Sequence, residues 1–154
     1  MKRTEKELRE GATHVDYEIL MLKAMAPLIG GSSPQDIEAD NAFLESFVLH
    51  VRNLIDFLYP PANIKPDDII ADHYIGEPAK WNQPRPGMTE LLIDARKRAN
   101  KLAAHLTYAR LGMQKNWEHS KILSELWVTL QWFLSELPAG RKEWFPALSE
   151  GPET

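Results

Sequence analysis

The chain has 154 residues, of which 44% are hydrophobic and 26% are charged, and this composition excludes a disordered polymer and fits one folded domain. Its 18 basic and 22 acidic residues give a net charge of -4, which excludes a strong overall attraction to nucleic acid or to an anionic membrane. The chain lacks cysteine, so disulfides, thiolate catalysis and cysteine-ligated metals are excluded as well.

The distribution of apolar residues predicts a cytoplasmic protein that does not contact a membrane. No uncharged apolar run approaches the roughly 20 residues that a membrane-spanning helix needs. The segment from Met1 to Glu7 is mostly charged and is not followed by an apolar stretch of signal-peptide length.

A first long helix is predicted to begin after Thr4, because Thr4 and Glu7 have the spacing of a capping box. Pro27 and the pair Gly30-Gly31 predict its end. Between these signals, apolar residues recur at steps of four and three and form one buried stripe. The stripe consists of Leu8, Ala12, Val15, Ile19, Leu22, Ala26 and Ile29.

A second long helix is predicted from Ser33-Pro34 to Tyr59. A capping hydroxyl followed by proline is typical of a helix start, and Pro60-Pro61 ends the helix. The predicted buried face is made of Leu44, Phe47, Val48, Val51, Leu54, Ile55 and Leu58.

Residues 60–87 form a long excursion that holds six of the eleven prolines. A short helix is predicted at residues 67–73, where the acidic pair Asp67-Asp68 indicates either a helix start or, less favoured, a cation site with Asp72 and His73. The excursion is predicted to pack onto the helices through its large apolar side chains. These are Ile69, Ile70, Tyr74, Ile75 and Trp81.

Two further long helices are predicted at residues 89–111 and 117–137, ended by Gly112 and Pro138. Together these elements predict an all-α fold: an antiparallel four-helix bundle in one domain, residues 1–149, followed by a mobile tail, residues 150–154. In the fourth helix, Val128 and Trp132 widen the apolar surface beyond one seam, so either the excursion or the second subunit of a homodimer is expected to cover it.

The polar residues of the second and third helices suggest a site. If these helices are antiparallel neighbours, their polar side chains meet in one cluster, which must be either a hydrogen-bonded network or a binding site. The predicted binding residues are His50, Arg52, Asn53, Asp56, Asn100 and Thr107, with Arg98 and His105 two turns apart on one face.

Several strings within these helices resemble a recurrent bacterial family of all-helical proteins of uncharacterised function, and more distantly the HEPN superfamily of four-helix domains. They are Leu44 to Phe47, His50 to Phe57, Asn100-Lys101 and Ala104 to Thr107. Some HEPN proteins are ribonucleases with an Arg and a His separated by four to six residues. The resemblance implies metal-independent RNA cleavage, with His105 as general acid or base and Arg98 stabilising the phosphorane charge.

Three functional interpretations remain open. The leading one is a HEPN-like helical protein that acts by association with itself, a partner protein or RNA. A metal-independent endoribonuclease using Arg98 and His105 is the second. A helical metalloprotein is the third, because four of the five histidines fall one to each long helix (His14, His50, His105 and His119). No Glu-x-x-His pair occurs, so no di-iron centre and no cofactor are predicted, and hydrogen-bonded or solvated histidines are the simpler expectation.

Overall fold

The computed structural model describes residues 3–31, 36–77, 81, 85–102, 108–112 and 116–152. Within these ranges the protein consists of helices and loops without any β-strand, which confirms the predicted all-α class. The long helices are α1 (Glu5–Met25), α2 (Ile37–Leu58), α4 (Glu90–Leu102) and α5 (His119–Glu136). The shorter elements are η1 (Ala26–Leu28), η2 (Ala71–His73), η3 (Tyr108–Gly112), α6 (Ala139–Lys142) and η4 (Pro146–Leu148).

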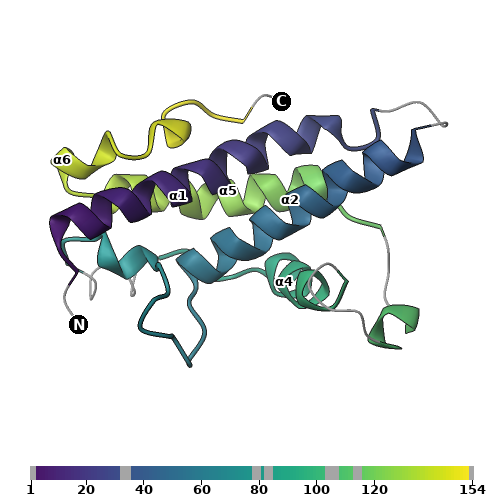
Figure 1. Ribbon diagram of the computed structural model, residues 1–154, viewed down its shortest axis with the longest axis horizontal. Coiled ribbons are helices and arrows are strands. Elements are labelled where there is room, and N and C mark those ends of the chain that lie inside the picture. The colour runs from purple at the N-terminus through teal and green to yellow at the C-terminus, as the bar shows by residue number, and fades with distance from the viewer. Residues whose placement is uncertain are drawn as a thin grey trace.

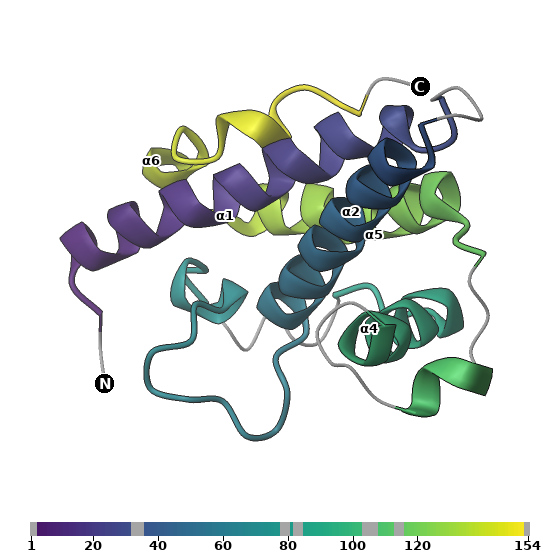
Figure 2. The same cartoon turned by 45° about the vertical axis from the view of Figure 1, so that its right-hand side comes forward.

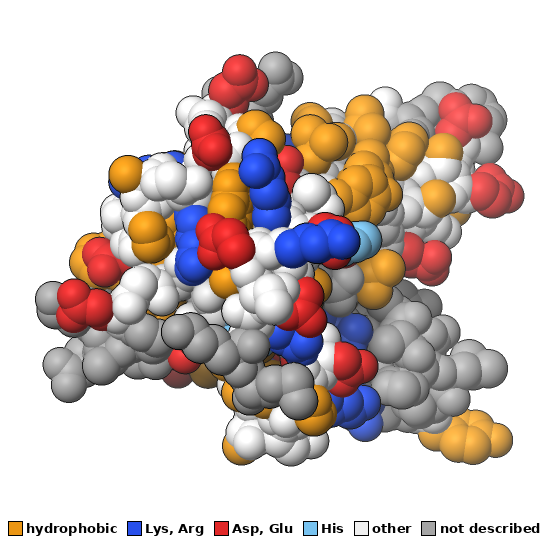
Figure 3. All heavy atoms as spheres, turned by 60° about the vertical axis from the view of Figure 1, so that its left-hand side comes forward, with side chains coloured by type: hydrophobic (Ala, Val, Ile, Leu, Met, Phe, Trp, Pro, Cys, Tyr) orange, Lys and Arg blue, Asp and Glu red, His pale blue; other side chains and the backbone are white. Residues whose placement is uncertain are grey.

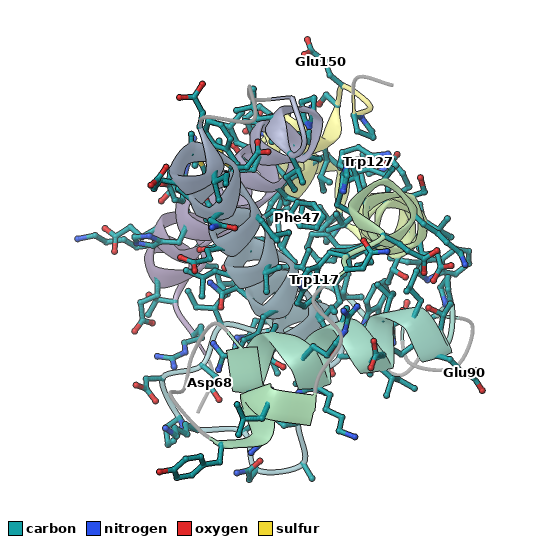
Figure 4. The ribbon with its side chains drawn as sticks, turned by 90° about the vertical axis from the view of Figure 1, so that its right-hand side faces the viewer. Phe47, Asp68, Glu90, Trp117, Trp127 and Glu150 are labelled. Atoms are coloured by element: carbon teal, nitrogen blue, oxygen red, sulfur yellow. The ribbon has the colours of Figure 1, made fainter. Side chains whose placement is uncertain are left out.

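Three of the long helices lie along one another, and α4 crosses them. In Figure 1, α1 and α2 run in opposite directions, and α5 passes behind them. Helix α4 is seen end-on in Figure 1 but lengthwise in Figure 4, where α2 and α5 point toward the viewer. The predicted bundle of four aligned antiparallel helices is therefore not confirmed.

The start and end of α1 follow the predicted local signals. Thr4 Oγ1 accepts a hydrogen bond from the Glu7 N–H at 3.2 Å, and the Glu7 carboxylate accepts one from the Thr4 N–H at 2.8 Å, so the capping box is present. After η1, Gly30 adopts a φ of +77°, a conformation that favours glycine. Helix α2 is described from Ile37 onward, and the predicted Ser33-Pro34 start lies outside the described residues.

The core forms where the apolar stripes of α1, α2 and α5 meet. Phe47 is fully buried. Figure 4 shows it pointing from α2 toward α5. Of the predicted third helix, residues 90–102 form α4 and residues 108–112 form the 3-10 helix η3, while residues 103–107 lie outside the described residues. None of the described helices combines the length and the apolar composition that a membrane crossing requires.

The excursion fills an opening between α1 and α2. These two helices diverge toward the N-terminal end of α1, and η2 lies between them there (Figures 1 and 2). Four of the five side chains predicted to be buried are buried, namely Ile70, Tyr74, Ile75 and Trp81. The prediction was wrong for Ile69, which is 38% exposed. The predicted helix at residues 67–73 is reduced to η2, because the Asp68 side chain accepts a hydrogen bond from the Lys65 N–H at 2.7 Å and holds this segment in a turn.

The segment after α5 returns along α1. The Ala147 N–H donates to Asp16 Oδ1 at 2.8 Å, and Lys23 Nζ donates to the carbonyl oxygens of Ala147 and Glu150 at 3.1 and 2.7 Å. Phe145 is fully buried and contacts the ring of Tyr74 edge to face. These contacts reach the first residue of the predicted tail, whose last two residues lie outside the described ranges.

Candidate functional site

The polar residues of α2 divide between two neighbouring helices. On one side, His50 Nδ1 and Asn53 Nδ2 lie 2.6 and 3.1 Å from Glu18 Oε2, which belongs to α1. On the other side, Arg52 Nε donates to Asn100 Oδ1 of α4 at 2.5 Å. Asp56 likewise forms an ion pair with Arg96 of α4 at 2.5 Å.

The single cluster predicted between the second and third helices is therefore divided. Helices α2 and α4 do contact each other, and Arg52, Asp56 and Asn100 lie at that contact. His50 and Asn53 instead face α1, because a helix turns by about 100° per residue and these positions emerge on a different side of α2. The remaining predicted members, His105 and Thr107, lie outside the described residues.

Arg98, one of the two predicted catalytic residues, lies in a structural contact between α4 and the segment before α5. Its side chain is 7% exposed and forms an ion pair with Asp94 at 2.7 Å. It also donates to the Asn116 carbonyl oxygen at 2.7 Å and lies 4.0 Å from the centre of the Trp117 ring. Figure 4 shows Trp117 between α4 and α5. The catalytic roles of Arg98 and His105 stay predictions.

Two small cavities lie along one face of α1, beside the excursion. Glu7, Gly11, His14 and Glu18 follow one another at steps of four, three and four and therefore share this face. The first cavity, of about 160 Å³, is called here the N-terminal cavity; it is lined by Arg3, Glu7, Leu8, Gly11, Asp67, Asp68, Ile69, His73 and Tyr74. The second, of about 180 Å³, is called the α1–α2 cavity; it is lined by His14, Val15, Glu18, Asn53, Leu54, Phe57 and Ile69.

A buried phenol reaches the N-terminal cavity. Tyr74 is 1% exposed, and its ring lies among Phe57, Phe133 and Phe145. A Cβ atom placed on Gly11 would lie 2.7 Å from the Tyr74 hydroxyl, so glycine at this position makes room for the phenol. Burial raises the pKa of Tyr74 to about 12, and the phenol therefore stays protonated at neutral pH.

The other titratable groups of the N-terminal cavity give it a negative balance. Hydrogen bonds from the Thr4 N–H and hydroxyl lower the pKa of Glu7, so Glu7 is a carboxylate at neutral pH. Burial, with a smaller contribution from Arg3, lowers the pKa of His73 and favours its neutral form. Among the lining residues that the structure describes, Arg3 is the one Lys or Arg, and Asp67 and Asp68 are also present.

A carboxylate with two neighbours forms the polar end of the α1–α2 cavity. Glu18 Oε2 accepts a hydrogen bond from Asn53 Nδ2 at 3.1 Å and lies 2.6 Å from His50 Nδ1. The edge of the Tyr17 ring packs against His50, with ring centres 6.0 Å apart. In the described part of the chain, no three His, Asp or Glu side chains are grouped so that they can hold a metal ion.

Sequence reasoning missed this face of α1 because it paired all the polar residues of α2 with the third helix, whereas His50 and Asn53 face α1. One signal was present: Gly11 interrupts a predicted helix beside its buried stripe, where alanine would be more stable by about 1 kcal/mol. Such a glycine indicates that another group approaches closely. The site is interpreted from its geometry, since no protein-family model, curated protein or solved structure matches this chain.

Proposed function

We propose that this chain works by association with a second copy of itself, through an apolar strip on the outer face of α1 and α2. The observation that carries the proposal is the exposure of three large apolar side chains on these adjacent helices. Tyr17 and Leu20 of α1 are 53% and 52% exposed, and Leu49 of α2 is 42% exposed. Leu28 of η1, the short helix that follows α1, is 41% exposed.

Tyr17, Leu20 and Leu49 lie on two helices that pack against each other. Tyr17 and Leu20 are three positions apart on α1, and the Tyr17 ring contacts His50, the residue next to Leu49. Figure 3 shows one face of the molecule on which hydrophobic side chains gather beside charged ones. A contiguous exposed apolar patch is typical of an association surface.

A second copy suits this surface because the strip runs along an antiparallel helix pair. A twofold axis would place the strip of one copy on the same strip of the other, which is the isologous contact found in most homodimers. The two pairs would then form an antiparallel four-helix arrangement. In this proposal the bundle expected within one chain arises between α1 and α2 of two chains.

Helix α5, the fourth of the long helices, has less exposed apolar surface for a dimer contact than the sequence predicted. Val128 is 59% exposed, and among the described residues of α5 no other large hydrophobic side chain is exposed. Trp132 is partly buried and packs against the core. Val128 therefore gives a matched control for the strip, as an exposed apolar residue on another helix.

Light scattering after size exclusion, over a range of concentrations, tests the proposal. The wild type is expected at twice the chain mass of 17.6 kDa, and Leu20→Asp at the mass of one chain. Val128→Asp is expected to stay dimeric, and circular dichroism should show that all three proteins are equally helical. A monomeric wild type at the highest concentration contradicts the proposal. So does a dimer that Val128→Asp dissociates and Leu20→Asp does not.

The other predicted partners are outcomes of the same experiment. A wild type that stays monomeric alone and forms a larger species only after RNA is added would favour the RNA-binding interpretation suggested by the HEPN resemblance. That result would refute self-association through the strip.

A further inference from the structure

We propose that the N-terminal cavity binds a small organic cation that carries an ammonium group and, two or three bonds away, a hydrogen-bonding oxygen such as a hydroxyl. This inference does not rest on self-association. Three observations carry it: a buried hydroxyl at the cavity wall, an excess of carboxylates around it, and a volume that suits a compound of only a few heavy atoms.

The Tyr74 hydroxyl is the recognition group. It lines the cavity from a residue that is 1% exposed, and none of the described side chains or backbone groups forms a hydrogen bond with it. A hydroxyl group donates one hydrogen bond, so a ligand oxygen in this cavity can accept the proton of Tyr74. Because the ring is fixed among Phe57, Phe133 and Phe145, the hydroxyl is already oriented when the ligand arrives.

The carboxylates select the charge of the ligand. Arg3 is committed to Glu7, with which it forms an ion pair at 3.7 Å, and to the Pro66 carbonyl oxygen, to which it donates a hydrogen bond. Asp67 and Asp68 add two further negative charges to the lining, while burial favours the neutral form of His73. Among the described lining residues the carboxylates therefore outnumber the cations, which favours a ligand with an ammonium group over an anion.

The volume of the cavity and the arrangement of its carboxylates narrow the chemical class of the ligand further. A cavity of about 160 Å³ has room for a short amino alcohol and excludes a nucleotide or a peptide segment. The carboxylates do not converge on one point, since the described residues contain no grouping of three acidic or histidine side chains that can hold a metal ion. An organic cation that spreads its contacts over the cavity fits this arrangement better than a bare metal ion.

The inference is tested by an amide-resolved NMR titration of the full chain with three probes of similar size. Ethanolamine carries the ammonium and the hydroxyl, propylamine carries only the ammonium, and propanol carries only the hydroxyl. Ethanolamine is expected to shift the amide signals around Gly11, Asp68 and Tyr74 and to bind about fivefold more tightly than propylamine, which is the effect of one buried hydrogen bond. Propanol is expected not to bind.

Two variants and two controls locate the binding groups. Tyr74→Phe removes only the hydroxyl and is expected to make ethanolamine and propylamine bind equally. Asp67→Asn is expected to weaken both amines. Tyr108→Phe, which loses an exposed hydroxyl, and Glu45→Gln, which loses an exposed carboxylate on α2, are expected to bind both amines as the wild type does.

Several results would overturn the inference. They are a wild type that does not bind ethanolamine, equal affinity of the wild type for ethanolamine and propylamine, or amide shifts located away from the cavity. An ethanolamine affinity that Tyr74→Phe leaves unchanged would also overturn it. If Tyr74→Phe fails to fold, Asp67→Asn decides, because Asp67 is exposed and its replacement leaves the core intact.

Discussion

Gly11→Ala is expected to destabilise the protein, although the same substitution normally stabilises a helix. The reason is the close contact between Gly11 and Tyr74. Gly11 lies inside α1, where replacing glycine by alanine normally stabilises by about 1 kcal/mol. At this position, however, the added Cβ atom would lie 2.7 Å from the Tyr74 hydroxyl, a distance at which one of the two groups must move. The Tyr74 ring cannot move freely, because three phenylalanine rings surround it.

The size of the effect follows from these opposing contributions. Forcing an extra carbon into a packed region costs about 1–3 kcal/mol, which exceeds the gain in helix propensity. Gly11→Ala is therefore expected to lower the free energy of unfolding by about 1 kcal/mol. In a Tyr74→Phe background the clashing atom is gone, and the nearest remaining atom is Ile69 Cδ1 at an ordinary 3.5 Å. There the same substitution should raise the free energy of unfolding by about 1 kcal/mol.

Urea unfolding followed by circular dichroism measures all four members of this double-mutant cycle. The coupling energy between the two positions is expected to be about 2 kcal/mol, with opposite signs of the Gly11→Ala effect in the two backgrounds. Gly140→Ala in α6, where the new Cβ meets open space, controls for the effect of alanine in an uncrowded helix. Equal effects of Gly11→Ala in both backgrounds would refute the close approach of Tyr74 to α1.

Two further substitutions test other parts of the structure. Arg98→Ala should lower the free energy of unfolding by about 2 kcal/mol, since it removes a charged hydrogen bond and the contact with the Trp117 ring, and Arg98→Lys should restore only part of this. A variant as stable as the wild type in thermal unfolding would contradict the structural role. Burial raises the pKa of Asp16 above its ordinary value of 3.8, although the hydrogen bond from Ala147 opposes the shift, so the folded state binds the proton more readily than the unfolded state. This contribution to stability is present at low pH and is lost as the pH rises through the folded-state pKa. Asp16→Asn keeps an oxygen acceptor, so its stability relative to the wild type should rise as the pH is raised from 3.8 toward neutrality. If the difference in free energy of unfolding between the two proteins does not change with pH, the prediction is wrong.

The parts of the fold that depend on neighbouring residues could be predicted from the sequence. The capping box at Thr4 and the apolar stripes of α1, α2 and α5 involve residues three or four positions apart, so their signals lie within one or two turns. The burial of Tyr74 and Trp81 in a proline-rich segment could also be predicted, because large aromatic side chains are rarely left in solvent.

The direction of α4 could not be predicted in this way. A helix with an apolar stripe can pack at several crossing angles, and the choice depends on how its side-chain ridges fit those of its neighbours. The same limitation applies to Arg98, for which the sequence predicted a role at a polar site and not a buried contact. In the structure it is buried, because Asn116 and Trp117, eighteen and nineteen positions away, supply a carbonyl oxygen and an aromatic ring.

The N-terminal cavity could not be predicted from local sequence patterns. The groups that form the N-terminal cavity come from α1 and from a loop more than fifty residues later, and no periodic pattern connects such segments. What the sequence does contain is a residue that contradicts its local context, a glycine within an otherwise well-formed helix. Natural sequences are locally consistent with their folds except where a close contact or a site requires otherwise. Gly11 is such a residue: it lowers the stability of the helix and leaves room for the Tyr74 hydroxyl beside the cavity. Substitution of Gly11 therefore measures these two effects separately.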